Sequence, residues 1–250
     1  MSSLFLERIF GPPLRREGWV VRPARTEELP SLRALRGLAF RGGGGDGDAF
    51  DADCLHLWIG RDGEGPRATI RVHHHPAGVL HEGYSAQYFD LGPLAGAPGP
   101  VLELGRLCAH PDHPQADLMR LIWAGVTRLV EGTGAARLIG CSSLQGTDPG
   151  RYSTALAALA ARHLGPDAHR PRPRPRPVET FAFGGLRAIR AAPGDLAVLP
   201  PLLRAYLAMG GWVGDHLVID RDLGTCIVFT CVEIASMPDS RKRVFRALAG

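Results

Sequence analysis

The stretch VLELGRLCAH, residues 101–110, decides how this sequence is interpreted. Its apolar residues predict a buried strand, yet Glu103 and Arg106 place two charges inside it. Positions three apart on a regular strand face opposite sides of the sheet. Gly105 between them predicts a β-bulge, which would turn both side chains toward one cleft. The alternative is an internal salt bridge without a catalytic role.

Strand and helix patterns alternate on both sides of this stretch. Period-two or continuous apolar runs predict strands at residues 19–24, 55–60, 66–75 and 136–143, and a terminal hairpin at 216–234. Helical periodicity appears at 26–40, with Thr26 as the capping residue, and at 118–129, 153–164 and 200–210. The alternation predicts an α/β fold with a mixed central sheet flanked by helices.

Three consecutive parts are expected along the chain. Residues 1–168 form the core, residues 169–178 an exposed Arg/Pro-rich segment, and residues 179–250 a C-terminal part that completes the same domain. Every second residue of RPRPRPRP, residues 170–177, lacks an amide hydrogen, which excludes helix and inner strand. The glycine-rich tract at 41–54 is expected to be a mobile loop.

Composition limits the classes of protein that fit. The 250 residues are 45% hydrophobic, but no apolar run reaches the roughly 20 residues of a membrane span, and no secretory signal is visible, so a cytoplasmic protein is expected. The five cysteines show no CxxC pair, which favours reduced thiols. The net charge of +4 fits an acidic partner: nucleic acid, an anionic membrane surface or an acidic carrier protein. The basic arm has no interleaved aromatic residues, which argues against nucleic acid.

Two other chemistries are weighed and set aside. The run His73, His74 and His75 suggests a metal site, but adjacent strand residues alternate faces, so no metal is expected. Ser142 and Ser143 lack a GxSxG elbow, which favours direct transfer over an acyl-enzyme.

Several motifs in order resemble a known family. Arg36-x-x-x-Phe40, Asp48-x-x-Asp51, Arg71 and Glu103-x-x-Arg106 are similar to the invariant set of acyl-homoserine-lactone synthases. The remaining motifs more closely resemble the related ornithine lipid N-acyltransferases, a hemolysin-like branch of the GNAT acyltransferases: FDADCLHL from Phe50, YSAQYFDL from Tyr84, GTDP from Gly146 and GDHLVID from Gly214. The resemblance extends from Trp19 to about Phe229 and implies a GNAT-like fold.

The resemblance also implies a reaction. A 3-hydroxyacyl chain would pass from the phosphopantetheine arm of acyl carrier protein to the α-amine of ornithine, giving lyso-ornithine lipid, with no permanently bound cofactor. Glu103 is the expected base and Arg106 its catalytic companion. The substrate-binding candidates are Arg36, Asp48, Asp51, Arg71, Tyr84 and Asp215, and for Asp215 and Asp220 the alternative is an ordinary turn acid.

Departures from the family pattern keep two alternatives open. Leu55 and Tyr88 stand where acids are usual, the segment HPDHPQAD at 110–117 lacks basic and glycine residues, and Cys226 and Ile227 break a Thr-Asp pattern. The alternatives are an acyl-homoserine-lactone-type synthase and a non-catalytic partner of an acyltransferase.

An amphiphilic product predicts peripheral membrane attachment. The apolar residues Leu4, Phe5, Leu6, Ile9 and Phe10 would enter the interface, helped by the arginines between 170 and 176. Packing of the N-terminal residues into the core is the alternative.

Overall fold

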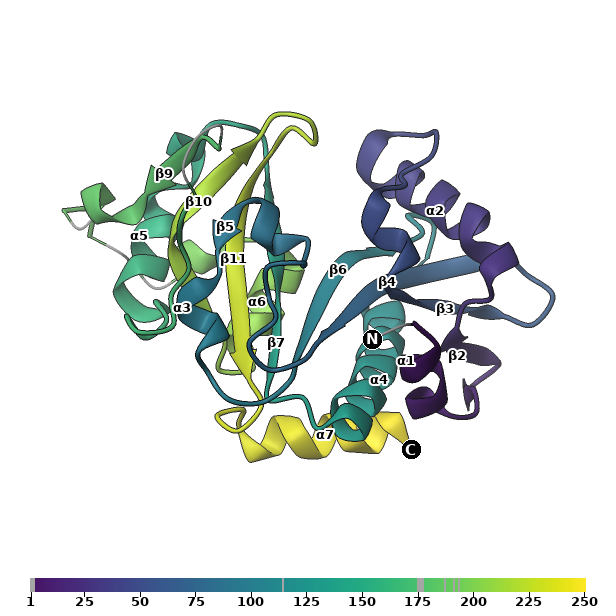
Figure 1. Ribbon diagram of the computed structural model, residues 1–250. Helices are drawn as coiled ribbons and strands as arrows, with labels where there is room; N and C mark the ends of the chain where they lie inside the picture. Colours follow the sequence, from purple (N-terminus) through teal and green to yellow (C-terminus); the bar gives the residue numbers. More distant parts are fainter. Residues whose placement is uncertain (1–2, 114, 175–177, 187, 191, 193) are drawn as a thin grey trace. The chain divides into compact units, whose positions relative to one another are not determined.

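The computed structural model describes residues 3–113, 115–174, 178–186, 188–190, 192 and 194–250 (Figure 1). The chain forms two compact units. The first comprises Met1–His74, Leu102–Ala135 and Asp239–Gly250, and the second His75–Val101 and Ala136–Pro238. Each unit is therefore assembled from segments that are far apart in the sequence.

The first unit contains strands in the order β1-β2-β3-β4-β6. Their bounds are β1 (Leu14–Arg16), β2 (Trp19–Pro23), β3 (Leu55–Arg61), β4 (Pro66–His75) and β6 (Val101–Ala109), and β1 to β4 pair antiparallel in succession. Its helices are α1 (Ser3–Phe10), α2 (Leu29–Arg41), α4 (Gln115–Thr133) and α7 (Asp239–Ala249), with short 3-10 turns at η1 (Thr26–Glu28) and η2 (Ala49–Ala52).

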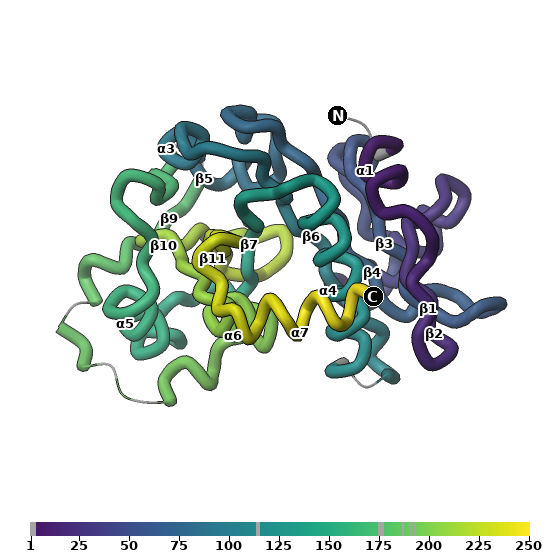
Figure 2. Tube along the Cα trace, turned by 90° about the horizontal axis from the view of Figure 1, so that it is seen from below, coloured from purple at the N-terminus to yellow at the C-terminus, as the bar shows by residue number. Residues whose placement is uncertain are grey.

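Apolar side chains of α1 and α4 close the core of this unit. Leu6 and Phe10 of α1 are each only 2% exposed, and α1 contacts both α4 and β3. Gly125 lets α4 approach the sheet, because a Cβ there would lie 2.6 Å from a methyl of Leu57. Helix α7 packs across α4 (Figures 1 and 2).

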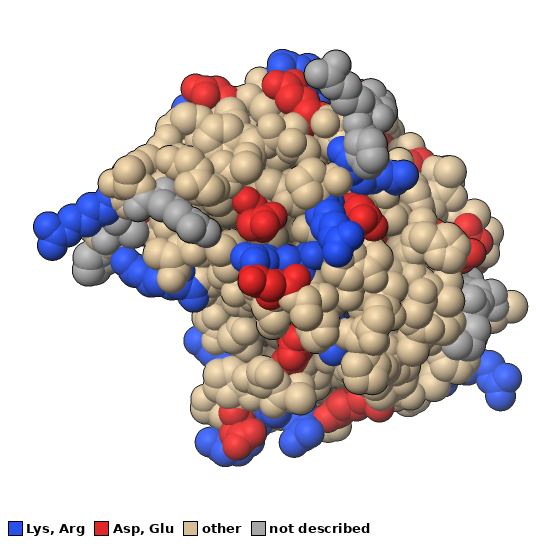
Figure 3. Space-filling model, turned by 60° about the vertical axis from the view of Figure 1, so that its left-hand side comes forward, with Lys and Arg blue, Asp and Glu red and all other residues tan. Residues whose placement is uncertain are grey.

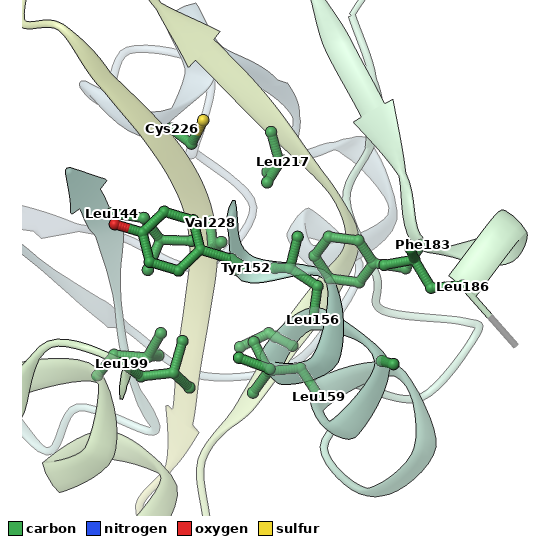
Figure 4. Packing of buried hydrophobic residues seen from close by; sticks show 14 residues of the cluster. Leu144, Tyr152, Leu156, Leu159, Phe183, Leu186, Leu199, Leu217, Cys226 and Val228 are labelled. Atoms are coloured by element: carbon green, nitrogen blue, oxygen red, sulfur yellow. The ribbon is translucent and has the colours of Figure 1, made fainter. Parts of the chain in front are cut away.

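The second unit is built on an antiparallel sheet in the order β7-β11-β10-β9. The strands are β7 (Arg137–Gln145), β11 (Thr225–Glu233), β10 (Trp212–Asp220) and β9 (Thr180–Ala182), and a separate pair joins β5 (Phe89–Asp90) to β8 (Arg172–Pro173). The helices are α3 (Gly92–Ala95), α5 (Ser153–Arg162) and α6 (Pro201–Ala208), with 3-10 turns η3 (Ser85–Gln87), η4 (Pro149–Tyr152), η5 (Phe183–Leu186) and η6 (Asp195–Val198). Leu156 and Leu159 of α5 pack with Leu217 and Val228 of the sheet (Figure 4).

Most of the predicted elements are confirmed, but one local prediction is wrong. Thr26 does not cap a helix: it opens η1, whose N-cap is Arg25, and α2 begins at Leu29. The basic arm is exposed at residues 172–174, as predicted, and it is also anchored: Arg172 and Pro173 pair with β5, and the Arg174 guanidinium donates to the carbonyl of Ala86. The rest of the arm, residues 175–177, lies outside the described residues.

The N-terminal segment is mainly a core element. Burial of Leu6 and Phe10 confirms the core-packing alternative for these two residues, which leaves Leu4, 65% exposed, as the large apolar side chain that α1 presents to solvent. Within the described part of the chain, no helix combines the length and the apolar character that crossing a membrane requires. On the face drawn in Figure 3, acidic and basic side chains are interspersed, so the net charge does not appear there as one basic patch.

Candidate functional site

A loop that folds back over a helix organises the charged residues of the first unit. Gly42, left-handed with φ 69°, caps the C-terminus of helix α2, and the amide of Gly43 donates to the carbonyl of Gly37 at 3.0 Å. Gly37 has no room for a side chain, since a Cβ there would lie 2.0 Å from the carbonyl oxygen of Gly44. The glycine tract is therefore held against α2, where the sequence suggested only a mobile loop.

This fold-back buries two aspartates under the loop. Asp46 is 2% exposed and Asp51 is 3% exposed, and Asp48 caps η2 by accepting from the amide of Phe50 at 3.0 Å. A buried carboxylate without compensation is strongly unfavourable. Each of these acids must therefore meet a cation.

Five arginines supply the compensating charge for the three aspartates. Arg36, fully buried on α2, reaches Asp51 at 2.8 Å and Asp46 at 3.1 Å. Arg71 of β4 donates to Asp48 and, at 2.9 Å, to Asp51. We call these residues the charge network, completed by Arg106, by Arg33 on Asp51 and by Arg41 on Asp46.

Arg106 joins the network through an unusual backbone. Its φ of 50° lies in the left-handed region, which costs an ordinary residue about 1–2 kcal/mol. In this conformation its guanidinium lies 2.9 Å from Asp46 and 3.3 Å from Asp48. The irregularity expected near Gly105 is thus present at the next residue, and such strain is often kept where function requires it.

The network fixes its acids in the charged form. Burial by itself would raise the pKa of Asp51, but Arg36, Arg71 and Arg33 outweigh it and hold the pKa far below the usual range. Burial also raises the pKa of Asp46, but the neighbouring arginines, Arg106 most of all, outweigh this effect and lower the pKa below its usual value. These aspartates are therefore permanent anions at neutral pH and poor proton acceptors.

Glu103 lies on β6 close to, but chemically apart from, these aspartates. It is 4% exposed, and a carboxylate oxygen lies within 4.8 Å of an imidazole nitrogen of His73 on β4. His74, the next residue, turns the other way and stacks on Phe5 of α1 at 5.4 Å between ring centroids. The alternation leaves His73 and His75 on one side of β4, and a ligand atom of each lies within 4.8 Å of a carboxylate oxygen of Glu103, so the structure brings together a candidate metal-binding group that the sequence argument sets aside.

The thiols of this unit are not nucleophiles at neutral pH. Burial raises the pKa of Cys54 to about 12 and that of Cys108 to about 12. Only the thiolate attacks a thioester effectively. The chemistry available in this unit is consequently that of carboxylates, imidazoles and guanidinium groups.

The remaining predicted residues belong to the second unit. Tyr84 and Tyr88 share a hydrogen bond of 3.2 Å between their hydroxyls, and Tyr88 donates to Asp220 at 3.0 Å. Asp220 also accepts from the amides of residues 222 and 223, which is the behaviour of a turn acid. Asp215 is half exposed and lies 2.9 Å from Nδ1 of His216.

The structure thus brings together Arg36, Asp48, Asp51, Arg71 and Arg106 in one network, and places Tyr84 and Asp215 in another unit. Sequence reasoning missed Asp46, Arg33 and Arg41. The spacing Asp46-x-Asp48-x-x-Asp51 was a usable signal, because all three acids follow one glycine tract.

Comparison with known proteins identifies the fold and the relatives. Residues 37–124, which contain the charge network except for Arg33 and Arg36 and also contain Glu103, match the family model described as acetyltransferase (GNAT) domain. The L-ornithine N(alpha)-acyltransferase of Rhodobacter capsulatus is 33% identical over 162 residues, 65% of this chain and 61% of that protein. The protein of the same name from Rhizobium meliloti is 29% identical over 214 residues, 82% of this chain and 72% of that protein. The chain is thus similar to proteins named L-ornithine N(alpha)-acyltransferase, and residues 37–124 match a GNAT domain.

The GNAT assignment agrees with the α/β architecture of the chain, in which helices flank the strands. Among solved structures, the N-acyl amino acid synthase FeeM from uncultured soil microbes superposes with a TM-score of 0.46 at 11% identity, over 86% of this chain and 95% of that one. That score is too low to support an inference about function.

Proposed function

We propose that this protein transfers a 3-hydroxyacyl chain from the phosphopantetheine arm of acyl carrier protein to the α-amine of ornithine. The observation that carries the proposal is the similarity, over 65% and 82% of the chain, to two proteins named L-ornithine N(alpha)-acyltransferase. The product is lyso-ornithine lipid, and the chain needs no permanently bound cofactor for this reaction.

Glu103 acts as the general base. An α-amine with a reference pKa near 8 is mostly protonated at neutral pH and must lose a proton before attack. Glu103 takes that proton, directly or through a water molecule, while nitrogen attacks the thioester carbonyl. The C–N bond forms, the C–S bond breaks, and the leaving sulfur recovers a proton as the thiol. The lowered pKa values of Asp46 and Asp51 make these aspartates poor proton acceptors, which favours Glu103 for this role.

Arg106 and Arg71 organise the site rather than transfer protons. A guanidinium stays protonated, so neither can act as a base. Both are bonded to Asp48, and this supports the role of orienting the acid loop more than that of holding the amino acid's carboxylate. Asp48, the most exposed of the three acids, is the proposed contact for an ornithine amine.

A carrier-bound donor suits the segment before α4 better than coenzyme A does. Helix N-termini in GNAT-type folds can offer free amides to phosphate groups. Here the approach, HPDHPQAD, has no glycine or basic residue, and Asp117 adds a negative charge to the first turn of α4. Such an end is unfavourable for a ligand with several phosphates.

The test uses purified protein, 3-hydroxyacyl carrier protein and ornithine, with the product detected by mass spectrometry. Glu103→Gln should lower the rate roughly 10²–10⁴-fold without loss of folding, the usual contribution of a general base. The matched control, Glu27→Gln, alters an exposed acid of η1 in the same unit and should keep the parent rate. Parent-like turnover of Glu103→Gln would remove Glu103 from the mechanism, and absence of product from any acyl donor would favour a non-catalytic partner role.

A further inference from the structure

A groove of about 820 Å³ lies on the first unit and shares no lining residue with the charge network. The β1–β2 hairpin, the first half of α4 and the helix α7 bound it, and α7 packs across α4 (Figures 1 and 2). All of its lining residues belong to one unit. We refer to it as the α4–α7 groove.

The floor of the groove is apolar and aromatic. Leu121 and Trp123 of α4 are 8% and 7% exposed, and the Trp123 ring lies 5.7 Å from that of Phe245 on α7. Trp19 of β2 closes the floor on the hairpin side. Aromatic residues of this kind dominate the energetics of binding surfaces, since each offers a large rigid area.

The rim of the groove is mainly cationic. Arg15 and Arg16 rise from β1, Arg120 from α4 and Arg241 from α7, all of them exposed. Glu17 and Asp117 are the two acids among the lining residues, and two of the four arginines already have acid partners: Arg15 pairs with Asp62, and Arg120 with Asp117 at 3.9 Å. The partner of such a surface should be apolar along its centre and acidic along its edges.

An amphipathic helix fits this description better than a bilayer does. The apolar floor is recessed, and Val244, 52% exposed, is the only large hydrophobic residue among those lining the groove that protrudes into solvent. A membrane surface is met by protruding apolar residues, whereas an open channel with an aromatic floor receives the apolar face of a helix.

The position of the groove indicates which protein supplies the helix. Glu103 lies on β6, which ends at Ala109, and α4 begins at Gln115. Six residues of strand separate Glu103 from that end, about 20 Å at 3.3 Å per residue. A protein that presents its thioester on a long flexible arm must dock at a distance of that order from the reacting carboxylate.

We propose that the α4–α7 groove docks an acidic amphipathic helix of the acyl carrier protein. This inference rests on the proposed donor, and it adds where the carrier binds. Docking here would lower the Michaelis constant for the carrier-bound donor and leave the chemical step to the residues around Glu103.

The test compares two donors that share the same acyl chain. One is the acyl carrier protein thioester, and the other is the acyl-phosphopantetheine thioester, which lacks the protein. The double variant Arg120→Glu/Arg241→Glu should raise KM for the carrier-bound donor at least tenfold, about the effect of reversing two exposed charges opposite an acidic partner. For acyl-phosphopantetheine, kcat and KM should stay at the parent values.

The control is Arg204→Glu, which reverses an exposed arginine of α6 in the other unit and should change neither donor. A second variant, Val244→Asp, tests the apolar part of the groove and should also raise KM for the carrier-bound donor alone.

The outcomes separate this inference from the proposed function. If the parent uses the carrier-bound donor and both groove variants keep its KM, the groove is not the docking site although the donor is correct. If the parent uses acyl-phosphopantetheine but not the carrier, the proposed donor is wrong and the inference falls with it. If the variants lose binding to phosphatidylglycerol vesicles but keep KM, the groove serves a bilayer and the inference is overturned.

Discussion

The energetic weight of the charge network can be measured with two arginines that share one carboxylate. Arg36 and Arg33 both bind Asp51, at 2.8 Å and 2.9 Å, but the Arg36 side chain is fully buried and that of Arg33 is 40% exposed. Replacing each by Met removes the charge and keeps an unbranched apolar stem. Because the two substitutions are chemically identical, a difference in their effects on stability reports the burial of the arginine that was replaced.

The expected costs of the two substitutions differ by about 2–3 kcal/mol. Breaking a buried ion pair by removing one partner costs about 3–5 kcal/mol. Asp46 and Asp51 keep other arginines, so the lower end, about 3 kcal/mol, is expected for Arg36→Met. Arg33→Met should cost about 0–1 kcal/mol, as exposed pairs do. In a chain of this size, 3 kcal/mol corresponds to a fall in Tm of roughly 6–12 °C.

The assay is denaturant unfolding followed by circular dichroism, with hydrogen exchange of peptides from α2 as the local readout. Hydrogen exchange is needed because the chain has two compact units, which can unfold separately. Exchange in α2 should accelerate in Arg36→Met and stay near the parent rate in Arg33→Met. Equal effects of the two substitutions, within about 1 kcal/mol, would refute the argument that burial makes this network stabilising.

Three other properties follow from the same contacts. Asp51, whose folded-state pKa is depressed, contributes stability that is fully present above its unfolded value near 3.9 and lost as pH falls below it, so Asp51→Asn should be destabilising at pH 7 and progressively less so below about pH 4 in urea titrations. Gly37→Ala should destabilise by more than about 1 kcal/mol despite the better helix propensity of alanine, whereas Gly45→Ala, which meets open space, should not; equal denaturation midpoints would contradict the fold-back of the loop. Cys54, with its pKa raised to about 12, should react with iodoacetamide at pH 8 far more slowly in the folded protein than in denaturant, and rapid labelling of the native protein would show the thiol to be accessible.

Local pattern was sufficient for most strands and helices because burial imposes a period on the sequence. The strand around Trp19, the strands of β3 and β4, and the helix α4 all appear within a few residues of their predicted bounds. Helices α1 and α7 were missed. Helix α7 has four basic residues in eleven, and its partner surface on α4 comes from residues more than a hundred positions away.

The sequence by itself determined the α/β class, the prominence of Glu103 and Arg106, and the set of aspartates and arginines that resembles an acyltransferase. Each depends on residue type and spacing, which the chain carries whether or not it is folded. The tertiary structure decided which of those charges pair. Arg36 lies fifteen residues from Asp51 and Arg71 twenty, and only the fold-back at Gly37 brings a glycine loop, a helix and a strand close enough to bury their charges together. Burial in turn separates the roles: aspartates surrounded by arginines stay ionised, because the guanidinium groups around each anion together stabilise it more than desolvation opposes it.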